Sequence, residues 1–391
     1  MGFCCKNELE ACLQGVFGTK AHKSRSDKSF KRVLFVFFFT MRKFFDSNAL
    51  WLSMLIGALG YKLFLPLKPT LPWWIFFMLF FTFCKVNPLD LRLHKWHWVL
   101  LITQMVFSFA TYAGVLYFTA NPVLAQGLLM CFIMPTATAA PIIAGKMGGS
   151  IQNLTTFTLL SNFATAIIVP ATFPLINPAT NMTFWPAFWL ILSRVAPLLL
   201  GPFFAAWFLR LGYNFYQRRK YLTGENREAL IVPLGKEAGQ RTFELPKKLA
   251  ILPFYLWVCS ITVLSSVVTE TTITNYKLQI TNILILLVSS FFICLLQFGL
   301  GKLIGYYVPA PSKGRDYQDV LINPAAAPKT MAGVSSITAG QAFGQKNTSL
   351  GVWMANTFLD PMSSLGAAAY IIWQNVFNSV QLFVVAHKKA K

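Results

Sequence analysis

The chain has 391 residues, of which 55% are apolar and only 12% are charged, with 34 Lys and Arg against 13 Asp and Glu. A water-soluble protein carries about twice that charged fraction, so the composition excludes an ordinary soluble enzyme. The formal net charge is +21, but the basic residues lie between hydrophobic runs instead of gathering on one arm, which argues against a nucleic-acid-binding protein. The seven cysteines have no metal-ligand spacing, and we interpret them as free thiols.

The first 45 residues are basic and contain one short apolar run at 33–41. As a helix this run would be about 13 Å long, which is too short to cross a bilayer. We therefore expect residues 1–45 to form a cytoplasmic segment with a helix that lies in the membrane interface.

The rest of the chain is a series of long apolar runs. Hydropathy predicts ten membrane spans, at 46–64, 71–87, 97–119, 122–146, 150–176, 182–209, 249–269, 278–306, 326–357 and 361–386. Residues 210–248 are expected to form a cytoplasmic loop, and 387–391 a cytoplasmic tail. The sequence thus predicts an all-α, multi-pass integral membrane protein.

The distribution of positive charge gives an orientation for these spans, because loops rich in Lys and Arg stay in the cytoplasm. With the N-terminus inside, the cytoplasmic segments hold 28 of the 34 basic residues, and the opposite side keeps Lys62, Lys68 and Lys277. The three others, Arg194, Lys302 and Lys346, lie within apolar runs. We therefore expect both termini to be cytoplasmic.

The polar stretch 210–248 is the longest after the N-terminal segment, and it suggests that the ten spans divide into two halves of five. Two five-span halves insert in opposite orientations, which is the inverted-repeat arrangement of many secondary transporters. The alternative is that 210–248 is simply a long loop, unrelated to any internal repeat.

Two predicted spans carry interruptions at matching positions, fourth in each half. In 134–149 two prolines lie six residues apart, and 339–349 places Gly, Gln, Lys and Asn at mid-membrane depth. Prolines break a helix, and unwound backbone in a membrane is tolerated only inside protein or along a cavity. Paired breaks of this kind point to a transporter's binding site. The alternative is a pair of proline-kinked helices with packing glycines.

These interrupted segments resemble the bile acid:sodium symporter family. The matching stretches are MPTATAAPIIAGKMGGSIQNLTTFTLLSN (134–162), GQKNTSLGVWMANTFLDPMSSLGAAAYIIWQN (344–375) and FFTFCKVNPLDLR (80–92), and the resemblance covers 46–386. It implies two inverted repeats, a panel domain (spans 1, 2, 6 and 7), a core domain (spans 3–5 and 8–10), and discontinuous fourth and ninth helices that cross. It also implies transport of organic anions such as bile acids and steroid sulfates, usually with sodium.

The chain departs from the family pattern where the family binds sodium. Ala140-Pro141 stands for a hydroxyl–Asn pair, Ala342 for a glutamate and Lys346 for a glutamine, while Gly344 and Asn347 are retained. No acidic residue lies inside a predicted span away from its ends. We therefore expect no cofactor, and sodium coupling is doubtful. Instead, the charge of Lys346 would replace the sodium ion, and the protein would be a uniporter or a proton-coupled transporter.

Candidate site residues follow from the breaks and from the resemblance. An ionisable side chain within a membrane is by default functional. Trp373-Gln374-Asn375 resembles a family Trp-His-Asn stretch, with Gln in place of His, and in the family the Asn and its neighbour line the anion site. The expected substrate-binding residues are Asn347, Asn375, Gln374, Lys346, Thr136, Thr138 and Arg194. The expected ion-coupling or crossover residues are Gln104, Thr158, Ser161, Asn162, Gln345 and Lys346. The alternatives are a lysine that snorkels to an interface, a structural Arg194, and a Gln374–Asn375 pair that binds neighbouring helices.

The function predicted from these features is secondary transport of a small organic anion by alternating access. An ordinary sodium-coupled symporter and a transporter-like binding or sensor protein are the alternatives. An enzyme is not expected, because the four histidines lie at or outside membrane edges and no span holds paired carboxylates or a nucleophile–base set. The expected partners are the lipid bilayer and the anion, while the oligomeric state is left open.

Overall fold

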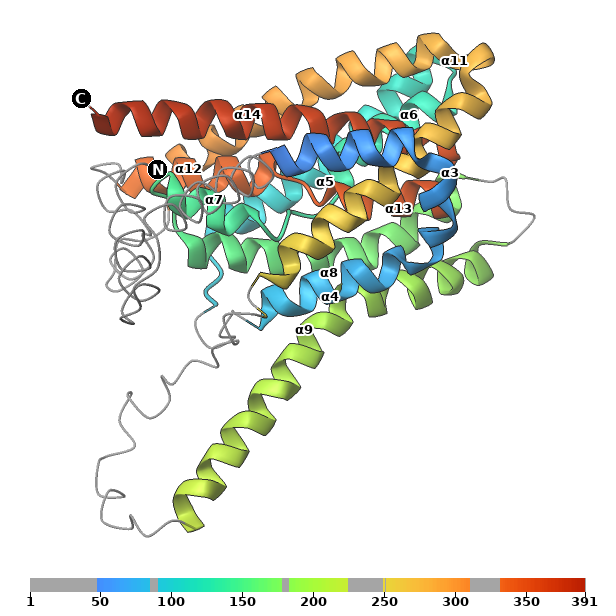
Figure 1. Ribbon diagram of the computed structural model, residues 1–391. Coiled ribbons are helices and arrows are strands. Elements are labelled where there is room, and N and C mark those ends of the chain that lie inside the picture. Colours follow the sequence, from blue (N-terminus) through green and yellow to red (C-terminus); the bar gives the residue numbers. More distant parts are fainter. Residues whose placement is uncertain are drawn as a thin grey trace, which may run out of the picture.

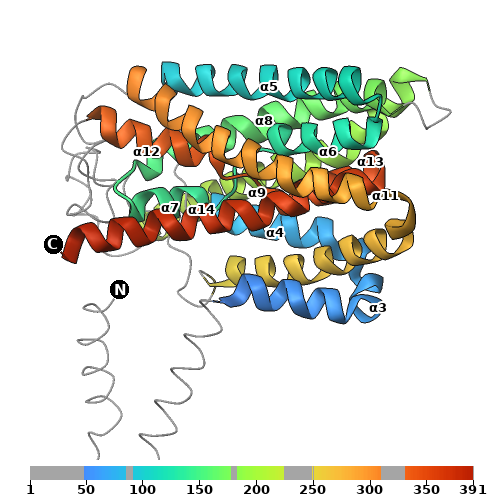
Figure 2. The same ribbon diagram turned by 90° about the horizontal axis from the view of Figure 1, so that it is seen from above.

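The computed structural model describes residues 48–84, 91–177, 183–223, 249, 251–309 and 331–390. Within these ranges the chain is helical and contains no strand. Most of the helices lie lengthwise beside one another, and the end of α9 projects away from the rest (Figures 1 and 2). The expected interfacial helix at 33–41 lies outside the described residues.

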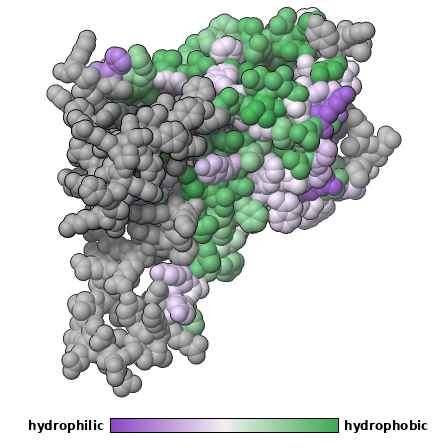
Figure 3. All heavy atoms as spheres, viewed as in Figure 1, coloured by the Kyte–Doolittle hydropathy of each residue, from purple (hydrophilic) through white to green (hydrophobic). Residues whose placement is uncertain are grey.

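Seven helical segments in the described ranges are long and apolar enough to cross a membrane. They are Tyr61–Phe83, Lys95–Thr119, Ile151–Ile176, Phe184–Tyr213, Leu252–Thr274, Ile280–Tyr307 and Pro361–Val385. Large apolar side chains such as Leu59, Tyr117 and Phe118 are more than three-quarters exposed, and Figure 3 shows hydrophobic residues over much of the described surface of one face. Exposed apolar area on this scale fits contact with lipid, so the chain is a multi-pass membrane protein.

The helices of the first part of the chain overlap the predicted ranges, but residues 65–70, between the first two ranges, are also helical, and the third helix begins two residues before its range. A helix at Asn48–Leu59 is followed by α3 (Tyr61–Phe64), η1 (Leu65–Thr70), α4 (Leu71–Phe83) and α5 (Lys95–Thr119). The predicted end of the second span, 85–87, lies outside the described residues. Helix α5 stops at Ala120, the one described non-glycine residue with a positive φ, of 51°.

Two helices are interrupted where the sequence predicts. Helix α6 (Pro122–Ile133) and α7 (Ala140–Lys146) are separated by an extended segment that contains Pro135. Helix α12 (Met331–Gly344) and α13 (Thr348–Phe358) are separated by residues 345–347, where the side chain of Asn347 caps α13. Proline explains the first break, whereas polar residues and an N-cap mark the second.

Helix α8 (Ile151–Ile176) continues through two prolines, and α9 spans Phe184–Thr223. Residues 210–223 of the predicted loop 210–248 are therefore helical. Charged residues end a hydropathy run without ending a helix, because Arg and Lys are good helix formers. The stretch 224–248 lies outside the described residues. In the sequence this stretch follows the sixth of the ten predicted spans, not the fifth. It therefore does not mark the boundary between two halves of five spans.

Helix α11 (Leu252–Tyr307) folds back on itself, as Figures 1 and 2 show, so it forms two limbs at Leu252–Thr274 and Ile280–Tyr307. The second limb packs against α12 through glycines. A methyl group added to Gly301 would lie 2.5 Å from the carbonyl oxygen of Ala339 and 2.9 Å from the Cα atom of Gly340. The two helix backbones therefore touch, as small residues in membrane helices allow.

The last helices are η6 (Pro361–Ser363) and α14 (Ser364–Ala390), so the expected tail at 387–391 is helical up to residue 390. Helical segments thus occupy all ten predicted ranges. In the described part of the chain, seven helical segments are long and apolar enough to cross a membrane. The ten-span count stays a prediction. The main core cluster joins residues of α4, α6, α8, α9, α11, α13 and α14 around the two breaks.

Candidate functional site

The two interrupted segments meet through their backbones. Thr136 and Lys346 form an isolated antiparallel bridge. The amide of Asn347 donates to the carbonyl of Pro135 at 2.7 Å, and the amide of Ala137 donates to the carbonyl of Gln345 at 3.0 Å. Each unwound segment therefore satisfies the backbone groups that the other one leaves free. We call this junction of residues 134–139 and 345–347 the crossover.

Side chains of α8 and α14 hold the crossover from two sides. The amide of Thr136 donates to Oγ of Ser161 at 3.1 Å, and the amide of Lys346 donates to Oε1 of Gln374 at 2.9 Å. The hydroxyl of Thr136 donates to the carbonyl of Ala342 at 2.7 Å. Thr136 therefore bonds within the crossover and is absent from the cavity lining, although it was expected to bind substrate.

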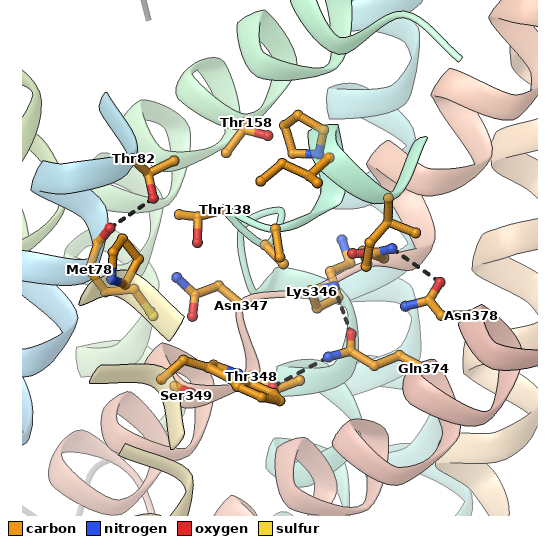
Figure 4. A pocket seen from close by; sticks show the side chains of 18 of the residues that line it. Met78, Thr82, Thr138, Thr158, Lys346, Asn347, Thr348, Ser349, Gln374 and Asn378 are labelled. Atoms are coloured by element: carbon orange, nitrogen blue, oxygen red, sulfur yellow. Dashed lines mark hydrogen bonds between the residues drawn. The ribbon is translucent and has the colours of Figure 1, made fainter. Parts of the chain in front are cut away.

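A cavity of about 480 Å³ lies beside the crossover (Figure 4). Its walls come from α4, α7, the crossover, the beginnings of α8 and α11, the N-terminal residues of α13, and α14. This volume is within the range of pockets that hold drug-sized ligands. Of the expected site residues, Thr138, Thr158, Gln345, Lys346, Asn347, Gln374 and Asn375 line it.

One wall of the cavity is polar and the other is apolar. Amide and hydroxyl side chains line the wall formed by the crossover, α13 and α14. The apolar part of the lining includes Met78 and Phe83 of α4 and two aromatic residues of α11. These two are Phe254 and Trp257, and their ring centroids lie 6.1 Å apart. Lys346 is the only charged residue in the lining drawn from the described ranges. The cavity is therefore suited to an amphipathic solute.

Asn347 occupies the most informative place in the polar wall. Its Oδ1 accepts from the amide of Leu350 at 3.3 Å and so caps α13. Its Nδ2 is buried without a partner in the described part of the chain. Figure 4 shows Asn347 among Thr138, Ser349 and Met78, all of which line the cavity. An unpaired donor beside the N-terminus of an eleven-residue helix is the arrangement that binds an anionic group.

Lys346 is only 1% exposed, and its Nζ has no hydrogen-bond partner among the described residues. The Nζ atom lies 5.0 Å from the centre of the Phe343 ring, which is within reach of a cation–π interaction. The lysine therefore does not snorkel to an interface. It is a buried group whose three N–H donors lack acceptors.

Amide side chains of α14 continue the polar wall. Nε2 of Gln345 donates to Oδ1 of Asn378 at 3.0 Å and also to Oε1 of Gln341. Nδ2 of Asn375 donates to the carbonyl of Ile371 at 2.7 Å. Asn378 and Gln341 were not among the expected site residues. The i, i+4 spacing of Gln374 and Asn378 on one helix face was the signal that could have found the first.

The expected ion-coupling residues surround the break after α6. Nε2 of Gln104 donates to the carbonyl of Met134 at 2.9 Å, and Nδ2 of Asn162 donates to the carbonyl of Thr158 at 2.7 Å. Oε1 of Gln104 and Oδ1 of Asn162 are buried and have no partner in the described ranges. These neutral oxygens could take part in binding a cation, but the described residues contain no cluster of three or more His, Cys, Asp or Glu.

Arg194, like Thr136, is an expected substrate residue that does not line the cavity. Its side chain is exposed on α9 and does not line the cavity. On the same helix the buried positions are Ile191, Val195, Leu198 and Leu199, which form a stripe of helical spacing. Arg194 lies beside that stripe and outside the cavity, so its role in substrate binding stays a prediction. Hydropathy alone shows the depth of a residue but not the face on which it lies.

No protein-family model matches the chain, and no curated protein sequence matches it.

Proposed function

We propose that this protein is a secondary transporter that moves an amphipathic organic anion across the membrane by alternating access. The observation that carries the proposal is the cavity beside the crossover, where the unpaired Nδ2 of Asn347 and the N-terminus of α13 face a wall of apolar and aromatic side chains. An oxyanion would bind these donors, while the apolar body of the solute would pack against Phe254 and Trp257.

The charge of the solute follows from the charges near the cavity. The described residues include two acids, Glu270 and Asp360, and neither lines the cavity. Lys346 does line it. A cationic solute would find no counter-charge among the described residues, whereas an anion would find helix-terminal and amide donors and a buried lysine. Bile acid-like molecules, steroid sulfates and small carboxylates fit this description.

Hydrogen bonds at the crossover support a division into two inverted repeats. Ser161 of α8 accepts from Thr136, and Gln374 of α14 accepts from Lys346. The residue that follows each acceptor is an asparagine, Asn162 or Asn375, and each donates to the carbonyl four residues earlier. The same pattern at corresponding places favours two five-helix repeats with ten spans, and a panel and a core domain that move against each other.

The position of the cavity favours an opening towards the cytoplasm. Its lining comes from the last turns of α4, the first turns of α8 and α11, and the middle of α14. The ends of α4, α8 and α11 adjoin the basic stretches 85–95 and 210–248 and Lys146, and such basic segments stay inside by the positive-inside rule. Both termini are then cytoplasmic.

Transport is proposed to be independent of sodium, with Lys346 in place of the ion. The acid of the family pattern is replaced by Ala342, which is buried and contributes only its backbone carbonyl to the crossover. A sodium ion at this depth would have neutral oxygens and a nearby lysine, and the lysine would repel it. The unpaired oxygens of Gln104 and Asn162 are the feature that favours an ordinary sodium symporter instead.

Counterflow in proteoliposomes tests the proposal. Vesicles are preloaded with unlabelled cholate, estrone sulfate or pantoate, and uptake of the same labelled anion is followed in sodium and in choline buffers of equal ionic strength. Saturable counterflow of at least one anion in both buffers is expected. A strict requirement for sodium would make the protein an ordinary symporter. Stabilisation by an anion without any counterflow would make it a binding or sensor protein, and counterflow of organic cations alone would refute the anion assignment.

A further inference from the structure

The end of α9 leaves the bundle of helices. Helix α9 is continuous as far as Thr223, and its last part projects away from the other helices in Figure 1. Nη2 of Arg210 donates to the carbonyl of Cys84, at the end of α4, at 3.2 Å. Two residues further on, a methyl group added to Gly212 would meet no described neighbouring element within 4 Å. We call residues 211–223 the projecting end of α9.

An apolar stripe on α9 runs from the membrane-spanning part into the projecting end. Its members are Phe204, Phe208, Leu211 and Phe215, and all four are exposed. Their spacing of four, three and four residues places them on one face of the helix. The first three lie within the apolar span Phe184–Tyr213, where an exposed apolar face is in contact with lipid. Phe215, which is 68% exposed, therefore continues a lipid-facing surface beyond the span.

The projecting end has the composition of a helix that lies on a membrane surface. It is about 20 Å long, and a helix of about this size is only marginally stable alone in water. Tyr213 and Tyr216 are exposed, and tyrosine is typical of the boundary between membrane and water. In the sequence, α9 contains five basic residues and no acidic residue, and three of the five lie in the projecting end. Such a basic segment attracts anionic headgroups.

We propose that the projecting end of α9 lies on the membrane surface and binds anionic phospholipid, with Leu211 and Phe215 inserted among the lipid chains. The leaflet is the one beside the end of α4, because Arg210 bonds there. A helix standing free in water would expose Phe215 to solvent. A soluble protein partner would have to cover a stripe that continues without a break into the lipid-facing surface. Lipid itself covers the whole stripe.

Hydrogen–deuterium exchange of the full-length protein tests this contact. The protein is placed, one copy per disc, in nanodiscs of phosphatidylcholine or of phosphatidylcholine mixed with phosphatidylserine. We expect the amides of 211–223 to exchange about tenfold more slowly, or slower still, in the anionic discs. High salt should reduce the difference, because it screens the charges. The amides of α5, which lie in the membrane in both discs, are the internal control and should exchange equally.

Two substitutions on opposite faces of the helix separate the stripe from a general effect. Phe215→Ser removes the outer end of the stripe. Tyr213→Ser is the matched control, because Tyr213 is also exposed but lies two residues from both Leu211 and Phe215, on the other side of the helix. Phe215→Ser should lose most of the protection in anionic discs, and Tyr213→Ser should keep it. Neither side chain is buried, so both variants should fold as the parent does.

The possible results either support the proposal or overturn it. Equal exchange in neutral and anionic discs would overturn it, and so would equal effects of the two substitutions. Protection that appears only in discs holding two copies would also overturn it, because the stripe would then be a contact between copies of the chain. The measurement involves no solute, so its result is independent of the counterflow that tests the proposed function.

Discussion

Asn347 has two separable tasks, and substitutions can distinguish them. Its Oδ1 caps α13 through the amide of Leu350, and its Nδ2 is unpaired beside the cavity. Asn347→Ala removes both atoms. Asn347→Asp keeps the capping oxygen, because an aspartate is an equally good N-cap, but it replaces the donor with a negatively charged acceptor.

The magnitudes follow from these contacts. Loss of an N-cap lowers the free energy of unfolding by about 1 kcal/mol. Loss of a hydrogen bond to a charged group weakens binding by about 1.5–3 kcal/mol, which is roughly 10- to 150-fold in Kd. Asn347→Ala should therefore lose both stability and affinity. Asn347→Asp should keep its stability, since an acid is favourable at a helix N-terminus, and should lose more than 100-fold in affinity (about 2.8 kcal/mol), because its carboxylate also repels the anion.

The assay is paired thermal unfolding and isothermal titration of each purified variant with the tightest-binding anion among cholate, estrone sulfate and pantoate. Asn121→Ala is the matched control, because Asn121 caps α6 through the amide of Leu124 at 3.2 Å and does not line the cavity. It should lose stability and keep its affinity. If Asn347→Asp binds the anion as tightly as the parent, the reasoning about the cavity is refuted.

Three further predictions concern the cavity, the packing and the coupling. Asn375→Ala should weaken anion binding by about 1–3 kcal/mol with little change in thermal unfolding; an unchanged titration curve would remove Asn375 from the site. Gly301→Ala should lower stability by about 1–3 kcal/mol because its methyl group would overlap α12, whereas Gly299→Ala, which has open space, should be neutral or stabilising in the same unfolding assay. Anion uptake by the parent should be equal in sodium and choline buffers, while Lys346→Gln, in which the fixed cation is gone, should lose any dependence of uptake on pH. A steep sodium requirement in the parent would contradict the assigned role of Lys346.

The breaks in two helices could be predicted because they depend on local chemistry. Proline removes a backbone donor wherever it occurs, and a polar run such as 345–347 stands out in an apolar segment. This local reasoning, together with the family resemblance, identified seven of the residues that line the cavity. It also marked the two segments as partners, although their contact through backbone atoms depends on the fold.

Features that depend on helix faces could not be predicted from hydropathy. Arg194 and Lys346 both interrupt apolar runs, yet one is exposed and the other is buried, because burial depends on which face each helix turns towards its neighbours. Gln297 lies in a predicted apolar span, and its hydrogen bond to the carbonyl of Cys131, 166 positions away in sequence, depends on how the helices pack. Helix α9 continued through charged residues because helix formation depends on backbone bonds, whereas hydropathy measures side chains.

The bridge at the crossover is made by main-chain atoms, and this has a consequence for how such a protein can change over evolution. The two bonds that join Pro135 with Asn347 and Ala137 with Gln345 involve no side chain, so they survive most substitutions at the bridged positions Thr136 and Lys346. A single substitution can therefore exchange a neutral residue for a cation at position 346 and leave the backbone bridge of the crossover intact. In the proposed transporter, a backbone bridge with replaceable side chains would let the coupling ion change without a new architecture.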